Sequence, residues 1–216
     1  MSGTNVLVLG ATGRTGTALL RHRPPGARLY AGARRRGAKT APVQRGADGV
    51  RLIDLDDPST MRRSLAGIDV VVNAIRLRED IAATALIDLH ELIRRASDED
   101  VDLRIVHVGG AGSLHLTGGL RFWQHPCFPA ATLPRGIAHA ELRDHLETGG
   151  CAAPWTYLVP PPDYLPDGPC TGDYKRLAPS DDETPFLTGR ISYEDFSLAV
   201  ADAIGNGWSG THLIRT

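Results

Sequence analysis

The chain has 216 residues and a formal net charge of −1, with 42% hydrophobic and 23% charged residues. These values are typical of a globular protein with a sizeable core, and they argue against a nucleic-acid binder, because phosphate affinity depends on clustered positive charge. No apolar run reaches the roughly 18 residues that a membrane span needs. We expect no secretion signal at the N-terminus and a reduced, cytoplasmic protein, since its three cysteines fit no zinc-site spacing.

Short apolar runs that alternate with helix-like stretches organise most of the chain. The apolar runs predict strands at residues 5–9, 27–33, 50–53, 68–75, 103–108, 154–159 and 211–214. The periodic stretches predict helices at residues 13–23, 58–66, 79–96 and 193–204. Asp57 and Ser192 stand at the N-cap positions of two of these helices. Because apolar strands lie between amphipathic helices, we predict an α/β fold with a doubly wound, mostly parallel sheet in a single domain, residues 1–216.

Two long segments interrupt this alternation. Residues 109–135 and 160–189 are rich in glycine and proline and show no clear period. Loops of this length in a compact domain are usually lids or binding segments. We therefore expect residues from about 160 to 216 to form a small region on the substrate side of the domain.

A glycine-rich turn follows the first predicted strand. Gly10, Gly13 and Gly16 are spaced G-x-x-G-x-x-G and open a helix. The first glycine permits a sharp turn, the second lets the backbone approach a pyrophosphate, and the third allows close packing of the helix on the sheet. The alternative is a purely structural turn, but the strand–turn–helix context favours dinucleotide binding. The rest of this predicted phosphate site is Thr12, Arg14 and Thr15.

The end of the second strand bears on the choice of nucleotide. Folds that prefer NAD usually carry a carboxylate there for the ribose 2′-hydroxyl, whereas this chain has Arg34 and Arg35. Guanidinium groups suit a 2′-phosphate, so NADP(H) is favoured over NAD(H), with an exposed basic loop as the alternative. Asp54 and Leu55 follow the third strand and are expected near the adenine, unless they belong to a solvated acidic loop.

Residues 8–16, with the sequence VLGATGRTG, resemble the opening of the atypical short-chain dehydrogenase/reductases. More narrowly, the chain is similar to their NAD(P)H-binding branch, which includes NmrA-like proteins and biliverdin reductase B. Later segments in the same order carry the similarity along the chain: residues 106–114, 138–140 at the opening of a helix, 155–161, 168–174 and 190–196. The resemblance implies a Rossmann-like sheet, bound NADP(H) or NAD(H), and often the reduction of a small conjugated or carbonyl substrate.

Further cofactor contacts are expected at the carboxyl ends of later strands, where ligands bind in doubly wound sheets. These residues are Ala74, Ile75, Gly109, Gly110 and Pro160.

The wider superfamily donates a proton from a Tyr-x-x-x-Lys pair, and none of the tyrosines here has lysine four residues later. Two other residues are therefore candidates for catalysis. Ser113 lies just past the fifth strand, where a hydroxyl is able to donate to a substrate carbonyl, although turn serines are common. His139 shares a helical stripe with Leu142 and Leu146, and an unperturbed imidazole titrates near pH 6.5, which suits general acid catalysis. A histidine packed at the helix start is the alternative.

Substrate contacts are expected from Phe122, Trp123 and Pro161, although the two aromatic residues are equally suited to anchoring a long loop. His107 lies within a strand and is expected in the core, and no metal site is expected. The function that these residues favour is an NADP(H)-dependent oxidoreductase acting on a small molecule, as a monomer or homodimer without a membrane or nucleic-acid partner. The alternatives are a non-catalytic, NADP-sensing regulator like NmrA and a lyase or isomerase on the same fold.

Overall fold

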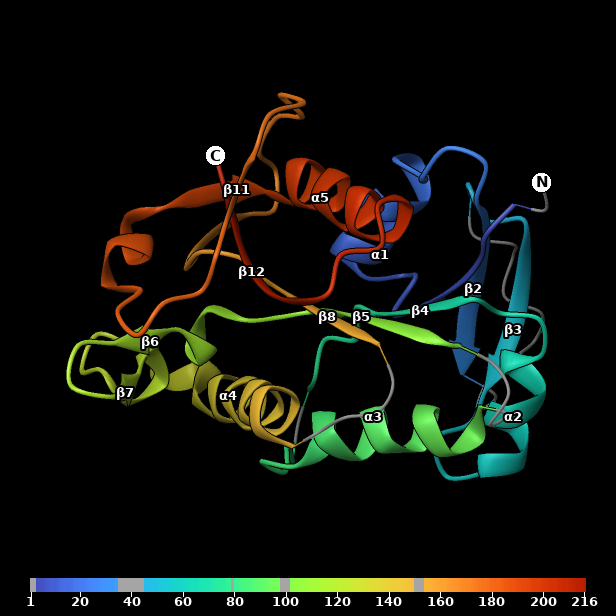
Figure 1. Ribbon diagram of the computed structural model, residues 1–216, viewed down its shortest axis with the longest axis horizontal. Helices are drawn as coiled ribbons and strands as arrows, with labels where there is room; N and C mark the ends of the chain where they lie inside the picture. Colours follow the sequence, from blue (N-terminus) through green and yellow to red (C-terminus); the bar gives the residue numbers. More distant parts are fainter. Residues whose placement is uncertain (1–2, 35–44, 79, 98–101, 150–153) are drawn as a thin grey trace.

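A sheet of eight strands runs through the protein (Figure 1). The computed structural model describes residues 3–34, 45–78, 80–97, 102–149 and 154–216. In chain order the sheet strands are β1 (Asn5–Leu9), β2 (Arg28–Arg34), β3 (Gly49–Ile53), β4 (Val70–Asn73), β5 (Arg104–Val108), β8 (Trp155–Val159), β10 (Lys175–Leu177) and β12 (Gly210–Arg215).

The strands lie in the order β3-β2-β1-β4-β5-β8-β12-β10. Every neighbouring pair is parallel except β10 and β12, which are antiparallel. The prediction of a doubly wound, mostly parallel sheet is therefore confirmed.

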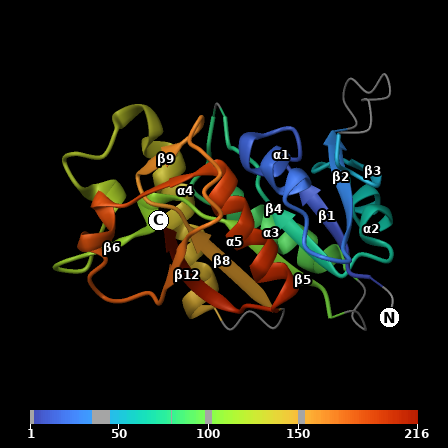
Figure 2. The same cartoon turned by 90° about the horizontal axis from the view of Figure 1, so that it is seen from above.

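Helices cover both faces of the sheet. They are α1 (Arg14–Arg21), α2 (Pro58–Leu65), α3 (Ala85–Ala96), α4 (Leu133–Thr148) and α5 (Tyr193–Gly205). Figure 1 shows α1 and α5 on one face and α2, α3 and α4 on the other, and Figure 2 looks down on the α1–α5 pair. Among the described residues, none of these helices combines the length and apolar character that crossing a membrane requires.

The two faces have separate cores because successive strand side chains point in opposite directions. Val6 and Val8 of β1 pack in the cluster under α1 and α5, together with Phe196. Leu7 and Leu9 pack in the cluster under α2 and α3. This double burial explains why β1 is apolar at every position after Asn5.

The two segments without periodicity contain short elements. Residues 109–135 hold the 3₁₀ turns η1 (Ala111–Ser113), η2 (Phe122–Gln124) and η3 (Ala130–Thr132) and the hairpin of β6 (His115–Leu116) with β7 (Leu120–Arg121). The segment after β8 holds η4 (Thr184–Thr188) and a parallel pair made by β9 (Asp163–Leu165) and β11 (Arg190–Ser192). Both segments extend beyond the β8–β12 half of the sheet in Figure 1.

The predicted helix at 79–96 was wrong at its start. Helix α3 begins at Ala85, because residues 80–84 form turns in which Asp80 has a φ of 40°. Ile81 fitted the helical spacing, but it packs on the core beneath α4 from a loop. Helix α4 in turn starts before residue 138, at Leu133, with Pro134 in its first turn.

The two predicted helix caps are confirmed. The Asp57 carboxylate accepts hydrogen bonds from the backbone N–H groups of Ser59 and Thr60 at the start of α2. The Ser192 hydroxyl accepts from the Asp195 N–H at 2.9 Å at the start of α5.

Candidate functional site

The glycine-rich turn after β1 is built so that side chains would not fit. Gly10 has a φ of 77°, and a Cβ there would collide with the Ala74 carbonyl oxygen at the end of β4. A Cβ on Gly13 would lie 3.1 Å from the Gly10 oxygen, and one on Gly16 would lie 2.8 Å from the Ala11 Cα. Gly16 therefore serves the close approach of α1 to the turn itself rather than to the sheet.

The N-terminus of α1 differs from those of α2 and α5. Its N-cap is Gly13, which makes no side-chain cap hydrogen bond, and its first turn contains no acidic residue. Unpaired amides and the positive end of the helix dipole favour an anion at such a terminus. Thr12 and Arg14 are exposed beside it. Backbone geometry and charge thus fit the diphosphate of a dinucleotide.

Thr15 points away from this terminus. It is buried, and its hydroxyl lies 3.0 Å from the Tyr164 hydroxyl of β9. Tyr164 stacks on Tyr193 at the start of α5, with ring centroids 3.7 Å apart. Thr15 thus links the glycine-rich turn to the segment after β8. The sequence did not indicate this link.

The nucleotide-selecting positions are only partly described. Arg34 ends β2 and is exposed, while Arg35 lies outside the described residues. Leu55, predicted near the adenine, is 41% exposed just after β3, and Asp54 beside it is half-buried. An apolar side chain exposed at this edge offers a surface for a flat base.

A line of polar groups runs inward from the end of β4. The Ile75 N–H donates to the Asn73 side-chain oxygen at 3.2 Å, and the Asn73 amide lies 3.3 Å from His107 Nδ1. His107 Nε2 lies 3.0 Å from His90 Nδ1. His107 is fully buried, as expected for a core histidine, and it anchors the backbone that leads into Ala74 and Ile75.

His139 lies directly against the loop that follows β5. A Cβ on Gly110 would stand 2.6 Å from the His139 ring, and one on Gly109 would stand 2.8 Å from the Tyr157 ring of β8. These glycines are thus required for packing between the loop, α4 and β8. His139 is half-buried, on the inward stripe that the sequence predicted.

Tyr157 joins the two predicted catalytic residues. Its hydroxyl lies 3.3 Å from His139 Nδ1, 3.3 Å from the Ser113 hydroxyl and 3.0 Å from the His139 carbonyl oxygen. The sequence offered no signal for this role, because the contacts join residues 18 and 44 positions apart. A Tyr–His pair thus lies between β8 and α4, beside the loop that follows β5.

Burial governs the charge of these groups. Burial, assisted by the charge of Arg135, lowers the pKa of His139 to about 4. Burial also raises the pKa of Tyr157 to about 12, although a hydrogen bond with Ser113 opposes the shift. Both side chains are therefore neutral at pH 7. This corrects the expectation that His139 titrates near neutral pH.

Ser113 lies a layer behind His139. It is fully buried, and its hydroxyl donates to the Gly110 carbonyl oxygen at 2.8 Å. Its own carbonyl oxygen accepts from Arg121 at 2.6 Å and from Arg143 at 3.0 Å. Ser113 thus fixes the loop after β5 and supports Tyr157 from within the protein.

The predicted substrate contacts are mostly turned inward. Phe122 is buried in the core beneath α4 and meets Phe128 edge to face at 5.1 Å. Trp123 is half-buried and, with Phe128, leaves no room for a side chain at Gly136. Anchoring of the loop is therefore the reading that the contacts support. Pro160 and Pro161 follow β8 and are also buried.

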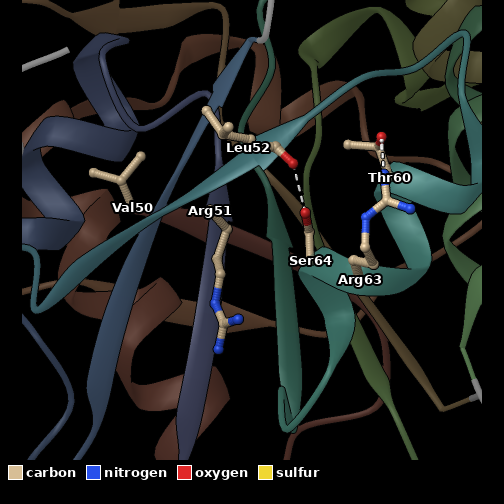
Figure 3. A pocket seen from close by; sticks show the side chains of 6 residues that line it. All are labelled: Val50, Arg51, Leu52, Thr60, Arg63 and Ser64. Atoms are coloured by element: carbon tan, nitrogen blue, oxygen red, sulfur yellow. Dashed lines mark hydrogen bonds between the residues drawn. The ribbon is translucent and has the colours of Figure 1, made fainter. Parts of the chain in front are cut away.

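Two hollows in the described surface lie away from the glycine turn and His139. One of about 360 Å³ is shown in Figure 3 beside the outer strand β3 and helix α2, lined by Val50, Arg51, Leu52, Thr60, Arg63 and Ser64. A second of about 870 Å³ is a groove between α2 and α3. Neither hollow is lined by the glycine turn, Arg135 or His139. The candidate site is therefore defined by the positions of its groups and not by a hollow.

One cluster has the composition of a metal site. Ligand atoms of His90, Glu91 and His145, between α3 and α4, lie within 4.8 Å of one another. Their hydrogen bonds already occupy them: His145 Nε2 is 3.3 Å from one Glu91 oxygen, and Arg94 donates to the other at 2.8 Å. His90 Nδ1 is engaged with His107. The cluster thus has the character of an ion-pair network joining two helices.

Comparison with known proteins gives a consistent picture. A family model described as NAD(P)H-binding matches residues 10–206. The uncharacterized protein YwnB of Bacillus subtilis (strain 168) is 26% identical over 208 residues, covering 91% of this chain and 90% of YwnB.

Two solved structures share the fold. The "putative NADH-flavin reductase" of Streptococcus pneumoniae TIGR4 superposes with a TM-score of 0.79, 24% identity and 99% coverage of both chains. The "putative epimerase" of Bacteroides thetaiotaomicron gives a TM-score of 0.80 and 23% identity, covering 99% of this chain and 97% of that one. The family match spans the glycine turn, the loop after β5 and helix α5, and it confirms the resemblance found in the sequence. The chain therefore belongs to the NAD(P)H-binding family, on a Rossmann-like sheet.

Proposed function

We propose that the protein is an NADPH-dependent reductase of a small conjugated or carbonyl compound. The observation that carries this proposal is that the phosphate-type turn and the His139–Tyr157 pair share one edge of the sheet. The turn follows β1, and the loop that His139 contacts follows β5, with only β4 between the two strands. Neighbouring strands lie about 4.8 Å apart, so the ends of β1 and β5 are roughly 10 Å apart. This separation suits a dinucleotide with its diphosphate on α1 and its nicotinamide near His139.

The preference for NADPH is supported by the end of β2. Residues 32–34 contain no carboxylate to bind a ribose 2′-hydroxyl, and Arg34 is exposed at the carboxyl edge. A guanidinium binds a phosphate through paired hydrogen bonds. The name of the Streptococcus pneumoniae neighbour adds flavins to the compounds worth testing as substrates.

In this mechanism, the bound nicotinamide supplies the hydride. The protein must orient the substrate and place a hydrogen-bond donor at its reacting oxygen. Tyr157 adjoins Nδ1 of His139, which leaves Nε2 for the substrate. The neutral ring carries one N–H. When the Tyr157 hydroxyl gives its proton to Nδ1 in place of the His139 carbonyl oxygen, that N–H is on Nε2 and can donate a hydrogen bond to the substrate. Ser113 positions Tyr157 rather than meeting the substrate.

The test is NADPH consumption, followed at its absorbance, with a panel of flavins, quinones and aldehydes. We expect oxidation only in the presence of an active substrate. His139→Asn should lower turnover about 100-fold or more, the scale of a lost acid–base or oxyanion contact, with NADPH affinity kept. His145→Asn, on the same helix but directed at α3, is the matched control and should retain turnover. Equal turnover in both variants would remove His139 from the mechanism.

A second candidate, a nucleotide-responsive regulator, is favoured by one specific observation. The side chains of Ser113 and Tyr157, the two hydroxyl groups next to His139, are fully buried. A protein of this kind would bind NADPH tightly and consume none of it across the whole panel. The same assay therefore separates the two functions.

A further inference from the structure

Arg135 is a half-buried cation at the candidate site. It lies in the first turn of α4, four residues before His139, so that the two side chains share a helix face. Arg143 continues the same stripe, but it is buried and bonded to Glu183 through both terminal nitrogens at 2.8 Å. Among the described residues, Arg135 has no comparable carboxylate partner. One arginine of this stripe is thus satisfied within the protein and the other is not.

More positive charge gathers around Arg135. Burial lowers its pKa, and the nearby charge of Arg76, which follows the β4 edge, lowers it further. The Tyr193 hydroxyl has the opposite effect and raises the pKa of Arg135. Arg14 stands 5.8 Å from the centre of the Tyr193 ring. Arg14 of the glycine turn thus lies beside Tyr193, and Arg135 of α4 is influenced by both Tyr193 and Arg76.

Within the described part of the chain, no ion pair neutralises any of these three arginines. Like charges repel one another, and half-buried Arg135 is screened less by solvent than the exposed Arg14 and Arg76, so the arrangement favours a bound anion. The diphosphate of the dinucleotide accounts for Arg14, which belongs to the glycine turn. Arg135 remains on the same helix face as His139, and Arg76 at the end of β4 acts on Arg135.

We propose that Arg76 and Arg135 bind a carboxylate or phosphate group of the substrate, and that the reductase is therefore selective for anionic conjugated compounds. This inference rests on the proposed function. A planar guanidinium binds either oxyanion through two parallel hydrogen bonds. The Tyr193 ring, already stacked on Tyr164, offers a flat surface for the conjugated part of the same molecule.

The experiment compares ligands that differ only in charge. FMN against riboflavin tests a phosphate, and 4-carboxybenzaldehyde against benzaldehyde tests a carboxylate. Binding is measured at equilibrium with NADP⁺, which allows no hydride transfer, and again without any dinucleotide. The result therefore does not depend on turnover, and a failure of the reductase proposal remains distinguishable from a failure of this one.

We expect wild-type protein to bind the charged member of at least one pair about 10- to 100-fold more tightly, the scale of one charge-assisted contact. Arg135→Ala and Arg76→Ala should remove that preference, while Arg135→Lys should keep part of it. Arg78→Ala, two residues beyond Arg76 and also exposed, is the matched control and should keep all of it.

Two results would overturn the proposal. The first is wild-type protein that binds neither member of any pair or binds both equally. The second is an Arg135→Ala variant that loses NADP⁺ affinity while keeping the ratio between charged and neutral ligands, because the arginines would then serve the dinucleotide. Circular dichroism of each variant ensures that a lost preference is not lost folding.

Discussion

At the scale of single residues, burial keeps several histidine side chains neutral. His90 is fully buried on α3 against His107, and burial lowers its pKa to about 4. Burial lowers the pKa of His107 well below its usual value and that of His139 to about 4. Each ring is therefore a hydrogen-bonding group at pH 7 rather than a cation, and folding must keep it so.

We predict that acid weakens the fold in a defined pH window. The unfolded chain takes up a proton at these histidines near pH 6.5, whereas folded His90 does so only near pH 4. Stability linked to His90 is therefore complete above pH 6.5 and falls as the pH drops to 4, by about 3 kcal/mol in all. Urea unfolding at half-unit steps measures this slope.

The matched variant for this window is His90→Asn, which removes the titrating group. It should unfold more easily at pH 7.5 but lose less stability than wild type between pH 6.5 and 4.5. Wild-type stability that stays flat across that window would contradict the assigned neutral state of the buried histidines.

At the scale of elements, the turn between β1 and α1 links backbone conformation to binding. Its glycines place the end of α1 against the end of β4, and neither the φ of Gly10 nor its contact with Ala74 tolerates a side chain. Hydrogen bonds from the backbone also attach the segment after β8 to α5. Thr171 and Gly172 donate backbone N–H groups to the buried Asp195 carboxylate at 2.8 and 3.0 Å.

Gly10→Ala and Gly26→Ala separate conformational strain from steric collision. Both glycines have left-handed φ values, 77° and 73°, but a Cβ on Gly26 meets nothing within 4 Å. Gly26→Ala should therefore cost about 1–2 kcal/mol and leave dinucleotide binding intact. Gly10→Ala should cost more and weaken binding at least 10-fold, as measured by urea unfolding and calorimetry. Equal effects of the two substitutions would show that the collision with Ala74 has no part in the site.

The elements also show what a sequence pattern does and does not determine. Continuous apolar runs predicted the central strands because β1 and β4 are buried on both faces, which leaves a signal at nearly every position. Periodicity failed at Ile81, where a loop packs an apolar side chain at helical spacing. The start of α4 was missed because Leu133 and Pro134 follow a segment of short turns with no period.

The candidate site was predictable only where the chemistry is local. The glycine turn is one continuous motif, so its residues and their role in the turn followed from spacing. Tyr157 and Arg135 gain their roles from partners that the fold brings together across α4, β5 and β8. Periodicity placed His139 on the inward face but gave no measure of its burial, which lowers its pKa below that of an unperturbed imidazole.

At the scale of the whole molecule, one layout connects these features. The strand order places β1, β4 and β5 side by side, and their carboxyl ends carry the phosphate-type turn, the Asn73–His107 anchor and the loop against His139. Under the proposed function, a dinucleotide spans that edge, and Arg34 on the next strand beyond β1 is the residue expected at the ribose of the adenine half.

The most direct test is calorimetric titration of the purified chain with NADPH and NADH. We expect both dinucleotides to bind and NADPH to bind at least about 10-fold more tightly than NADH, which is the scale of one charge-assisted phosphate contact. Arg34→Ala should reduce this difference, whereas Arg28→Ala, at the opposite end of β2, should leave it unchanged. Absence of binding by either dinucleotide would contradict the account at its centre.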